Sequence, residues 1–180
     1  DIFAGYLAHK MGLPISKLII ATNQNDVLHR VMTDAVYSQS EITHTLSPSM
    51  DISISSNFER LLFDLYSGDG EKIRNLMAAF PAQSIQLDKN VIGKARALFD
   101  SAAVDDQLTC ETISKVYGES GYLLDPHSAT GVSAARTCQL NSEEPVVCLA
   151  TAHPAKFSDA IRSANISEPP KVPEHMIHLQ

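Results

Sequence analysis

A hydroxyl and an imidazole follow an apolar run late in the chain, and this combination can bind a small ligand. The run is 145–150. Thr151 and His153 come directly after it, and Pro154 suits the first turn of a helix. Polar groups at the carboxyl end of a buried strand lie where open α/β sheets bind ligands. The more common role of a lone histidine such as His153 is a satisfied residue at a strand end, and both roles stay open.

Two amides and a carboxylate follow a second apolar run, at 18–21. These are Asn23, Asn25 and Asp26, whose side chains can hydrogen-bond a ligand. The alternative is that they cap a helix beginning near residue 27, because Asn and Asp are favoured N-cap residues. The residue types alone fit either role.

Other reactive side chains have weaker patterns. His175 and His178 have a spacing that metal ligands use on a helix, but the proline-rich tail gives them no rigid frame, so we expect no metal site. Cys110, Cys138 and Cys148 are odd in number and form no C-x-x-C pair. We expect them to be reduced core residues rather than nucleophiles, which favours a cytoplasmic protein. The chain has no G-x-S-x-G, H-E-x-x-H or glycine-rich phosphate-binding motif.

The elements that must position these groups alternate between strands and helices. This order favours an α/β fold with a largely parallel sheet and flanking helices. We expect one body over 1–166 and a proline-rich surface tail over 167–180. Phe58, Leu61, Leu62 and Leu65 fall on one helix face and predict a buried contact. The predicted strands are 18–21, 41–46 and 146–150, and the predicted helices are 2–11, 27–32, 57–66, 71–80, most of 91–118, 133–138 and 154–164. Residues 125–130 can open the helix over 133–138, because Pro126 suits a position in the first turn.

Charge and hydropathy exclude some partners. The net charge is -7 and the isoelectric point is about 5.4, without a Lys/Arg cluster, which argues against a nucleic-acid surface. No apolar stretch approaches the length of a membrane-spanning helix, so we expect no membrane partner. With 44% hydrophobic residues, the 180-residue chain can form one compact core or a large part of a bigger one.

Six segments that extend over most of the chain form an ordered set of motifs. They are 1–6 (DIFAGY), 21–26 (ATNQND), 45–52 (TLSPSMDI), 55–62 (SSNFERLL), 124–129 (LDPHSA) and 151–157 (TAHPAKF). Any one of them would be a weak signal, but together and in this order they resemble the threonine synthase family, in the longer form found in bacteria and fungi.

The resemblance implies a pyridoxal-phosphate enzyme of the tryptophan-synthase-β-like fold, fold type II. Such an enzyme converts O-phospho-L-homoserine and water into L-threonine and phosphate, and the family form is often monomeric. Thr151 matches the hydroxyl residue that binds the cofactor's pyridine nitrogen. Asp1 matches the last residue of the loop that binds the cofactor phosphate. Asn23, Asn25, Asp26 and His153 are expected near this site.

The resemblance also implies that no catalytic residue lies in this chain. The family's Schiff-base lysine belongs to its N-terminal half, a segment without a counterpart here, so we expect the chain alone to be inactive and to need that half as its partner. Two alternatives stay open. One is a related phospholyase that releases 2-oxobutyrate, and the other is a truncated, non-catalytic binding module.

Overall fold

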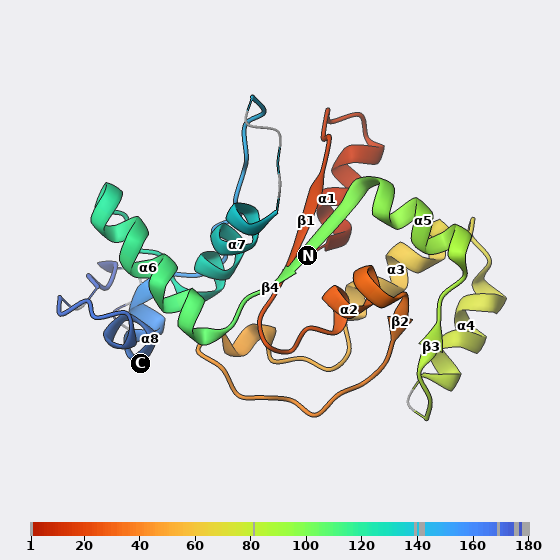
Figure 1. Cartoon of the computed structure of the whole chain (residues 1–180), viewed down its shortest axis with the longest axis horizontal. Coiled ribbons are helices and arrows are strands. Elements are labelled where there is room, and N and C mark those ends of the chain that lie inside the picture. The colour runs from red at the N-terminus through yellow and green to blue at the C-terminus, as the bar shows by residue number, and fades with distance from the viewer. Residues whose placement is uncertain are drawn as a thin grey trace.

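The computed structural model has a parallel pair of strands at its centre. It describes residues 2–80, 82–138, 140, 143–168, 170–174 and 177. Strand β1 (Leu18–Thr22) pairs in parallel with β4 (Phe99–Ala103), so that Leu18 lies opposite Phe99 and Thr22 opposite Ala103 (Figure 1). A second, antiparallel pair joins β2 (Val36–Tyr37) to β3 (Ile85–Gln86). The α/β prediction is confirmed.

Alternating side chains of β1 point to two different helical layers, as the pleat of a strand requires. Ile20 packs into the large core cluster, which includes residues of α2 (Val27–Asp34). Ile19 and Ala21 instead pack beside Ala134 of α7 (Pro126–Thr137). The strand pair therefore lies between α2 on one face and α7 on the other.

The large core holds the amphipathic helices of the first half of the chain. Phe58, Leu61, Leu62 and Leu65 are all buried on α3 (Ser56–Leu65), which confirms the predicted helix face. The ring of Tyr37 stacks on Phe80 with centroids 4.0 Å apart. The remaining helices of this half are α1 (Ile2–Lys10), α4 (Gly70–Ala79) and α5 (Lys89–Leu98).

A smaller cluster joins the helices of the second half. Ile113, Leu124 and Ile161 form its buried centre. It unites α7 with α6 (Asp106–Ser120) and α8 (Ser158–Ser163). The chain also has two short 3-10 turns, η1 (Pro48–Met50) and η2 (Pro154–Lys156), and η2 leads into α8. No helix in the described ranges combines the length and apolar character needed to cross a bilayer.

Two element predictions were wrong. Segment 146–150 forms no regular secondary structure, and Val147 and Leu149 are 81% and 69% exposed. Segment 41–46 is a loop, because the Asn25 side chain takes up the backbone groups of Thr43 that a strand partner would bind. The region 91–118 is mostly helical, as predicted, but β4 separates its two helices because residues 99–103 pair with β1.

The helix predicted over 133–138 with its opening at 125–130 is confirmed, since α7 begins at Pro126. One predicted helix differs in detail. Helix 154–164 begins as the η2 turn and becomes α-helical only at Ser158.

Candidate functional site

Asp125 closes the amino end of α7 from a fully buried position. The proline at the first helical position lacks an N–H, and the next two amides need acceptors. Asp125 Oδ1 accepts both, from His127 N at 2.9 Å and from Ser128 N at 3.4 Å. The side chain is 0% exposed, so these protein donors replace the water that a carboxylate would otherwise bind.

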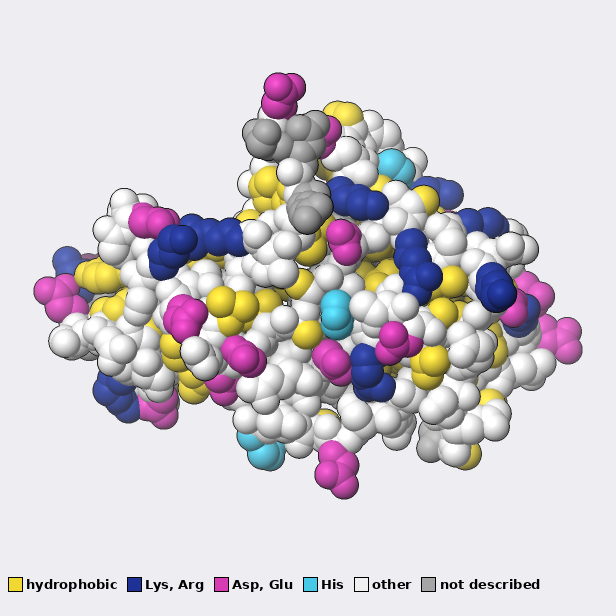
Figure 2. Space-filling view, viewed as in Figure 1, with side chains coloured by type: hydrophobic (Ala, Val, Ile, Leu, Met, Phe, Trp, Pro, Cys, Tyr) yellow, Lys and Arg dark blue, Asp and Glu magenta, His cyan; other side chains and the backbone are white. Residues whose placement is uncertain are grey.

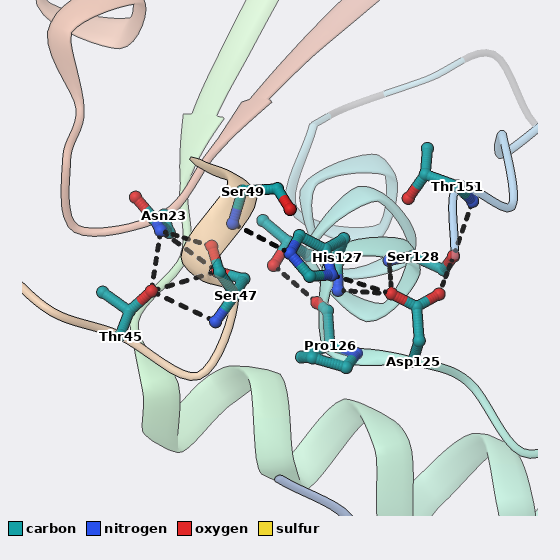
Figure 3. A network of polar contacts seen from close by, with 10 residues as sticks. Asn23, Thr45, Ser47, Ser49, Asp125, Pro126, His127, Ser128 and Thr151 are labelled. Atoms are coloured by element: carbon teal, nitrogen blue, oxygen red, sulfur yellow. Dashed lines mark hydrogen bonds and ion pairs between the residues drawn. The ribbon is translucent and has the colours of Figure 1, made fainter. Parts of the chain in front are cut away.

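Ser128 forms hydrogen bonds both with Asp125 and with the backbone of Thr151. Its hydroxyl donates to Asp125 Oδ2, and its oxygen accepts the backbone N–H of Thr151 at 3.1 Å (Figure 3). A carboxylate can only accept, so the serine proton points to Asp125 and its lone pair faces Thr151. The bond thus joins the start of α7 to the exposed segment 145–151.

His127 carries the contact in the other direction, to the η1 turn. Its Nδ1 lies 3.0 Å from Asp125 Oδ1, and its Nε2 accepts the backbone N–H of Ser49 at 3.2 Å (Figure 3). These partners assign the neutral tautomer with the proton on Nδ1. The ring also meets Phe157 edge-on at 4.7 Å between centroids. Three distant parts of the sequence are thereby held together.

The serine, histidine and aspartate of this cluster do not form a hydrolase triad. In such a triad the histidine links the aspartate to the serine nucleophile. Here Asp125 contacts both Ser128 and His127 directly, and His127 Nε2 is occupied by the Ser49 amide. The cluster therefore positions backbone and has no free base.

The charge of Asp125 is maintained by its donors. Burial alone would raise its pKa, but hydrogen bonds from His127 and Ser128, through both side chains and backbone, outweigh burial and lower the pKa below 3.8. The helix N-terminus favours the same charge. The cluster consequently carries a stable carboxylate at neutral pH.

A second polar cluster lies at the carboxyl end of β1. Asn23, which is 1% exposed, donates through Nδ2 to Thr45 Oγ1 at 2.8 Å and to Ser47 Oγ at 3.0 Å (Figure 3). The same amide also donates to Asp51 Oδ1 at 2.8 Å. Its Oδ1 accepts the backbone N–H of Asn25 at 2.9 Å. These amides hold the loop before η1 against the sheet, and η1 in turn contacts His127.

The other predicted site residues lie in simpler settings. Asp26 is at the N-cap position of α2, but its side chain binds Arg30 Nε at 2.8 Å and makes no capping bond. His153 caps η2, where its Nδ1 accepts the Ala155 amide at 3.2 Å. Asp1, His175 and His178 lie outside the described residues.

Sequence reasoning missed the central residues of the cluster. Asp125, His127 and Ser128 were interpreted only as the opening of a helix. The available signal was a dense run of polar residues, Asp-Pro-His-Ser, at the start of a helix that carries few large apolar side chains. A helix start rich in polar residues can be buried only if its polar groups form hydrogen bonds with other groups of the protein.

Known threonine synthases match this chain over almost its entire length. The sequence profile described as "Threonine synthase, C-terminal" matches residues 128–180. The threonine synthase of Pseudomonas aeruginosa is 52% identical over 99% of this chain. The chain is homologous to the threonine synthases. It spans 38% of the length of that relative and corresponds to a C-terminal part.

Solved threonine synthases share the fold as well as the sequence. The crystal structure of the pyridoxal-phosphate-bound enzyme from Brucella melitensis matches 99% of this chain with a TM-score of 0.93 at 44% identity, and this chain covers 38% of it. The yeast enzyme matches 98% with a TM-score of 0.88 at 42% identity, and the chain covers 39% of it. The fold predicted from the threonine synthase resemblance is confirmed.

The setting of Thr151 is compatible with the cofactor role that the family resemblance implies for it. Its backbone is fixed by Ser128, while its side chain is exposed and has no hydrogen-bond partner among the described residues. A free, neutral hydroxyl can hydrogen-bond a pyridine nitrogen without adding negative charge. The donor chemistry of this residue therefore matches pyridoxal phosphate.

Proposed function

We propose that this chain is the C-terminal part of a pyridoxal-phosphate-dependent threonine synthase that forms L-threonine and phosphate from O-phospho-L-homoserine and water. The observation that carries the proposal is the exposed hydroxyl of Thr151 on a backbone anchored to a buried carboxylate. Homology to threonine synthases over almost the entire chain supports the same conclusion.

In this proposal Thr151 binds the pyridine nitrogen. When bound, the cofactor supplies an electron sink for carbanion chemistry. A hydroxyl in place of a carboxylate leaves the ring nitrogen less strongly protonated. Asn23 and Asn25 hold the loop at the end of β1, and His153 shapes the turn after Thr151. Asp1 is proposed to end the loop that binds the cofactor phosphate.

The Schiff-base lysine is proposed to lie in a part of the protein outside this chain. Lys156, which is close to Thr151 in sequence, belongs to η2, and its Nζ lies over the Phe157 ring at 6.0 Å. The proposed domain organisation keeps 1–166 in the catalytic domain and 167–180 as a tail. We further propose a cytoplasmic, monomeric protein, in keeping with the free thiols of its three cysteines.

The run 145–150 is proposed to be a sheet strand completed by the part of the protein outside this chain. It is apolar and exposed, it forms no regular secondary structure here, and the chain spans 38% of a relative's length. An exposed strand edge offers unpaired backbone groups for such pairing. The same pairing would place Thr151 at the carboxyl end of a strand, where α/β folds bind ligands.

The test uses the longer protein that contains this chain. Its intact mass is measured before and after borohydride reduction, and its products from O-phospho-L-homoserine are identified. A mass increase of one reduced cofactor together with threonine and phosphate supports the proposal. A product mixture of 2-oxobutyrate and ammonia would identify a phospholyase instead. Absence of any cofactor adduct would favour a non-catalytic module.

The role of Thr151 has its own test in the same protein. Thr151→Ala removes one hydrogen bond, so cofactor affinity should fall by about 2- to 10-fold while the covalent attachment is retained. The measurement is a cofactor titration followed by absorbance. Unchanged affinity and turnover would contradict the assigned contact.

A further inference from the structure

We propose that Ser128, held by Asp125, is a positioning residue that sets the place of Thr151 in the cofactor site. This inference rests on the proposed function, because it concerns how the cofactor-binding hydroxyl is oriented. Neither residue needs to touch the cofactor. Their effect passes through one backbone hydrogen bond, from Thr151 N to Ser128 Oγ at 3.1 Å.

The geometry leaves Ser128 only one way to bond. Its proton is taken by Asp125 Oδ2, because the carboxylate accepts and cannot donate. The remaining acceptor capacity faces the Thr151 amide. Ser128 is 4% exposed, so water competes little for this position. A buried polar group with all its partners in place has one stable orientation.

The anchor is needed because the segment before Thr151 is loosely held. Residues 145–151 are exposed and make no regular secondary structure. The side chain of Ser16 contacts the carboxylate of Glu144, which directly precedes this segment. Among the described residues, the hydrogen bond from Thr151 N to Ser128 Oγ joins the Thr151 backbone directly to helix α7. Holding a group in place before binding lowers the entropy lost on binding.

Contacts of Asp125 on its other side connect Ser128 to the end of strand β1. Asp125 also binds His127, which accepts the Ser49 amide, and Ser47 in the same turn region binds Asn23 at the end of β1. Thr151 is thus positioned relative to β1 through side chains that are buried. Figure 3 shows two sets of hydrogen bonds, one around Asn23 and Ser47 and one from Ser49 to Thr151, and the backbone between Ser47 and Ser49 joins them.

The experiment compares variants of the longer protein. Ser128→Ala removes the anchor and keeps the volume small, and Ser128→Thr retains a hydroxyl. The matched control is Ser133→Ala, which removes another buried hydroxyl from the same helix. Thr151→Ala reports on the cofactor contact itself. For each protein we would measure cofactor affinity, the absorbance spectrum of the bound cofactor, and hydrogen exchange of the Thr151 amide.

Ser128→Ala should weaken cofactor affinity by about 2- to 10-fold and accelerate exchange of the Thr151 amide by a similar factor. It should shift the cofactor spectrum in the same direction as Thr151→Ala. Ser133→Ala should change neither quantity, and Ser128→Thr should restore most of both. Protection of the Thr151 amide in the unmodified protein supports the anchor even where a variant folds poorly.

Two results would overturn the inference. One is rapid, unprotected exchange of the Thr151 amide in the unmodified protein. The other is an equal loss of affinity in Ser128→Ala and Ser133→Ala, which would indicate a general loss of stability. Thr151→Ala separates this failure from that of the proposed function: a strong effect there with none from Ser128→Ala rejects only the positioning role.

Discussion

The apolar face of α3 and the apolar run 145–150 have similar residues and opposite fates. Leu62 on α3 is 1% exposed, whereas Leu149 in the run is 69% exposed. The face of α3 meets the aromatic rings and helices of its own half of the chain. Run 145–150 lies on the part that projects beside α7 (Figure 1). Hydrophobic pattern predicts burial only where the chain itself supplies the surface to pack against.

The exposure of run 145–150 is not accompanied by a charged patch on the face of the molecule shown in Figure 2. On the face shown in Figure 2, acidic and basic side chains are interspersed and do not gather into a patch of one sign. An exposed run of apolar residues is the kind of surface that another polypeptide covers. The two regions therefore differ because this chain contains the surface that packs against α3 but none that covers run 145–150 among the described residues.

The largest expected effect comes from placing a charge in the buried region. Leu62→Asp buries an unpaired carboxylate and should cost about 5 kcal/mol of unfolding free energy, enough to prevent folding. Circular dichroism and urea denaturation measure it. A soluble variant with normal stability would show that the face of α3 is not packed as described.

Removing Asp125 tests how much the buried polar cluster contributes to the free energy of unfolding, compared with the apolar core around Leu62. Asp125→Ala leaves buried donors of His127 and Ser128 without an acceptor, and should cost about 3 kcal/mol. Because the folded pKa is lowered below 3.8, the contribution is present above that pH and is lost as pH falls through the folded value.

The measurement is urea denaturation of both proteins between pH 7 and pH 2. The gap in unfolding free energy should be constant near neutral pH and should narrow in acid. A gap that widens on acidification would contradict the direction of the pKa shift.

A smaller effect is expected where one buried hydroxyl is removed without changing the apolar core. Tyr37 Oη accepts the Ser55 amide at 3.2 Å, and Tyr37→Phe should cost about 1 kcal/mol. The matched control is Tyr122→Phe, whose ring is exposed and should give no change. Equal midpoints for both variants in urea would show that the Tyr37 bond contributes nothing.

The smallest effect is expected at the exposed run. In this chain, Leu149→Asp should change the unfolding free energy by less than about 0.5 kcal/mol, since the side chain already contacts water. In the longer protein the same change should destabilise strongly, because the proposed pairing would bury it. Equal, small effects in both would contradict the proposed strand.

The sequence by itself determined the elements whose residues satisfy local rules. Periodicity predicted α3, the apolar run predicted β1, and Asp125 with Pro126 predicted the start of α7. The ordered family motifs predicted the fold that the solved relatives confirm. The residue assignments of the cofactor site remain predictions from that resemblance.

Only the tertiary structure decided how the polar residues are used. Strand β4 forms inside a helix-like stretch because β1 pairs with it, and the loop 41–46 forms because Asn25 binds its backbone. The path from Asp125 through Ser128 to Thr151 joins residues that are distant in sequence. Local patterns cannot specify such contacts, because a hydrogen bond between distant residues depends on where the packed helices and strands bring them.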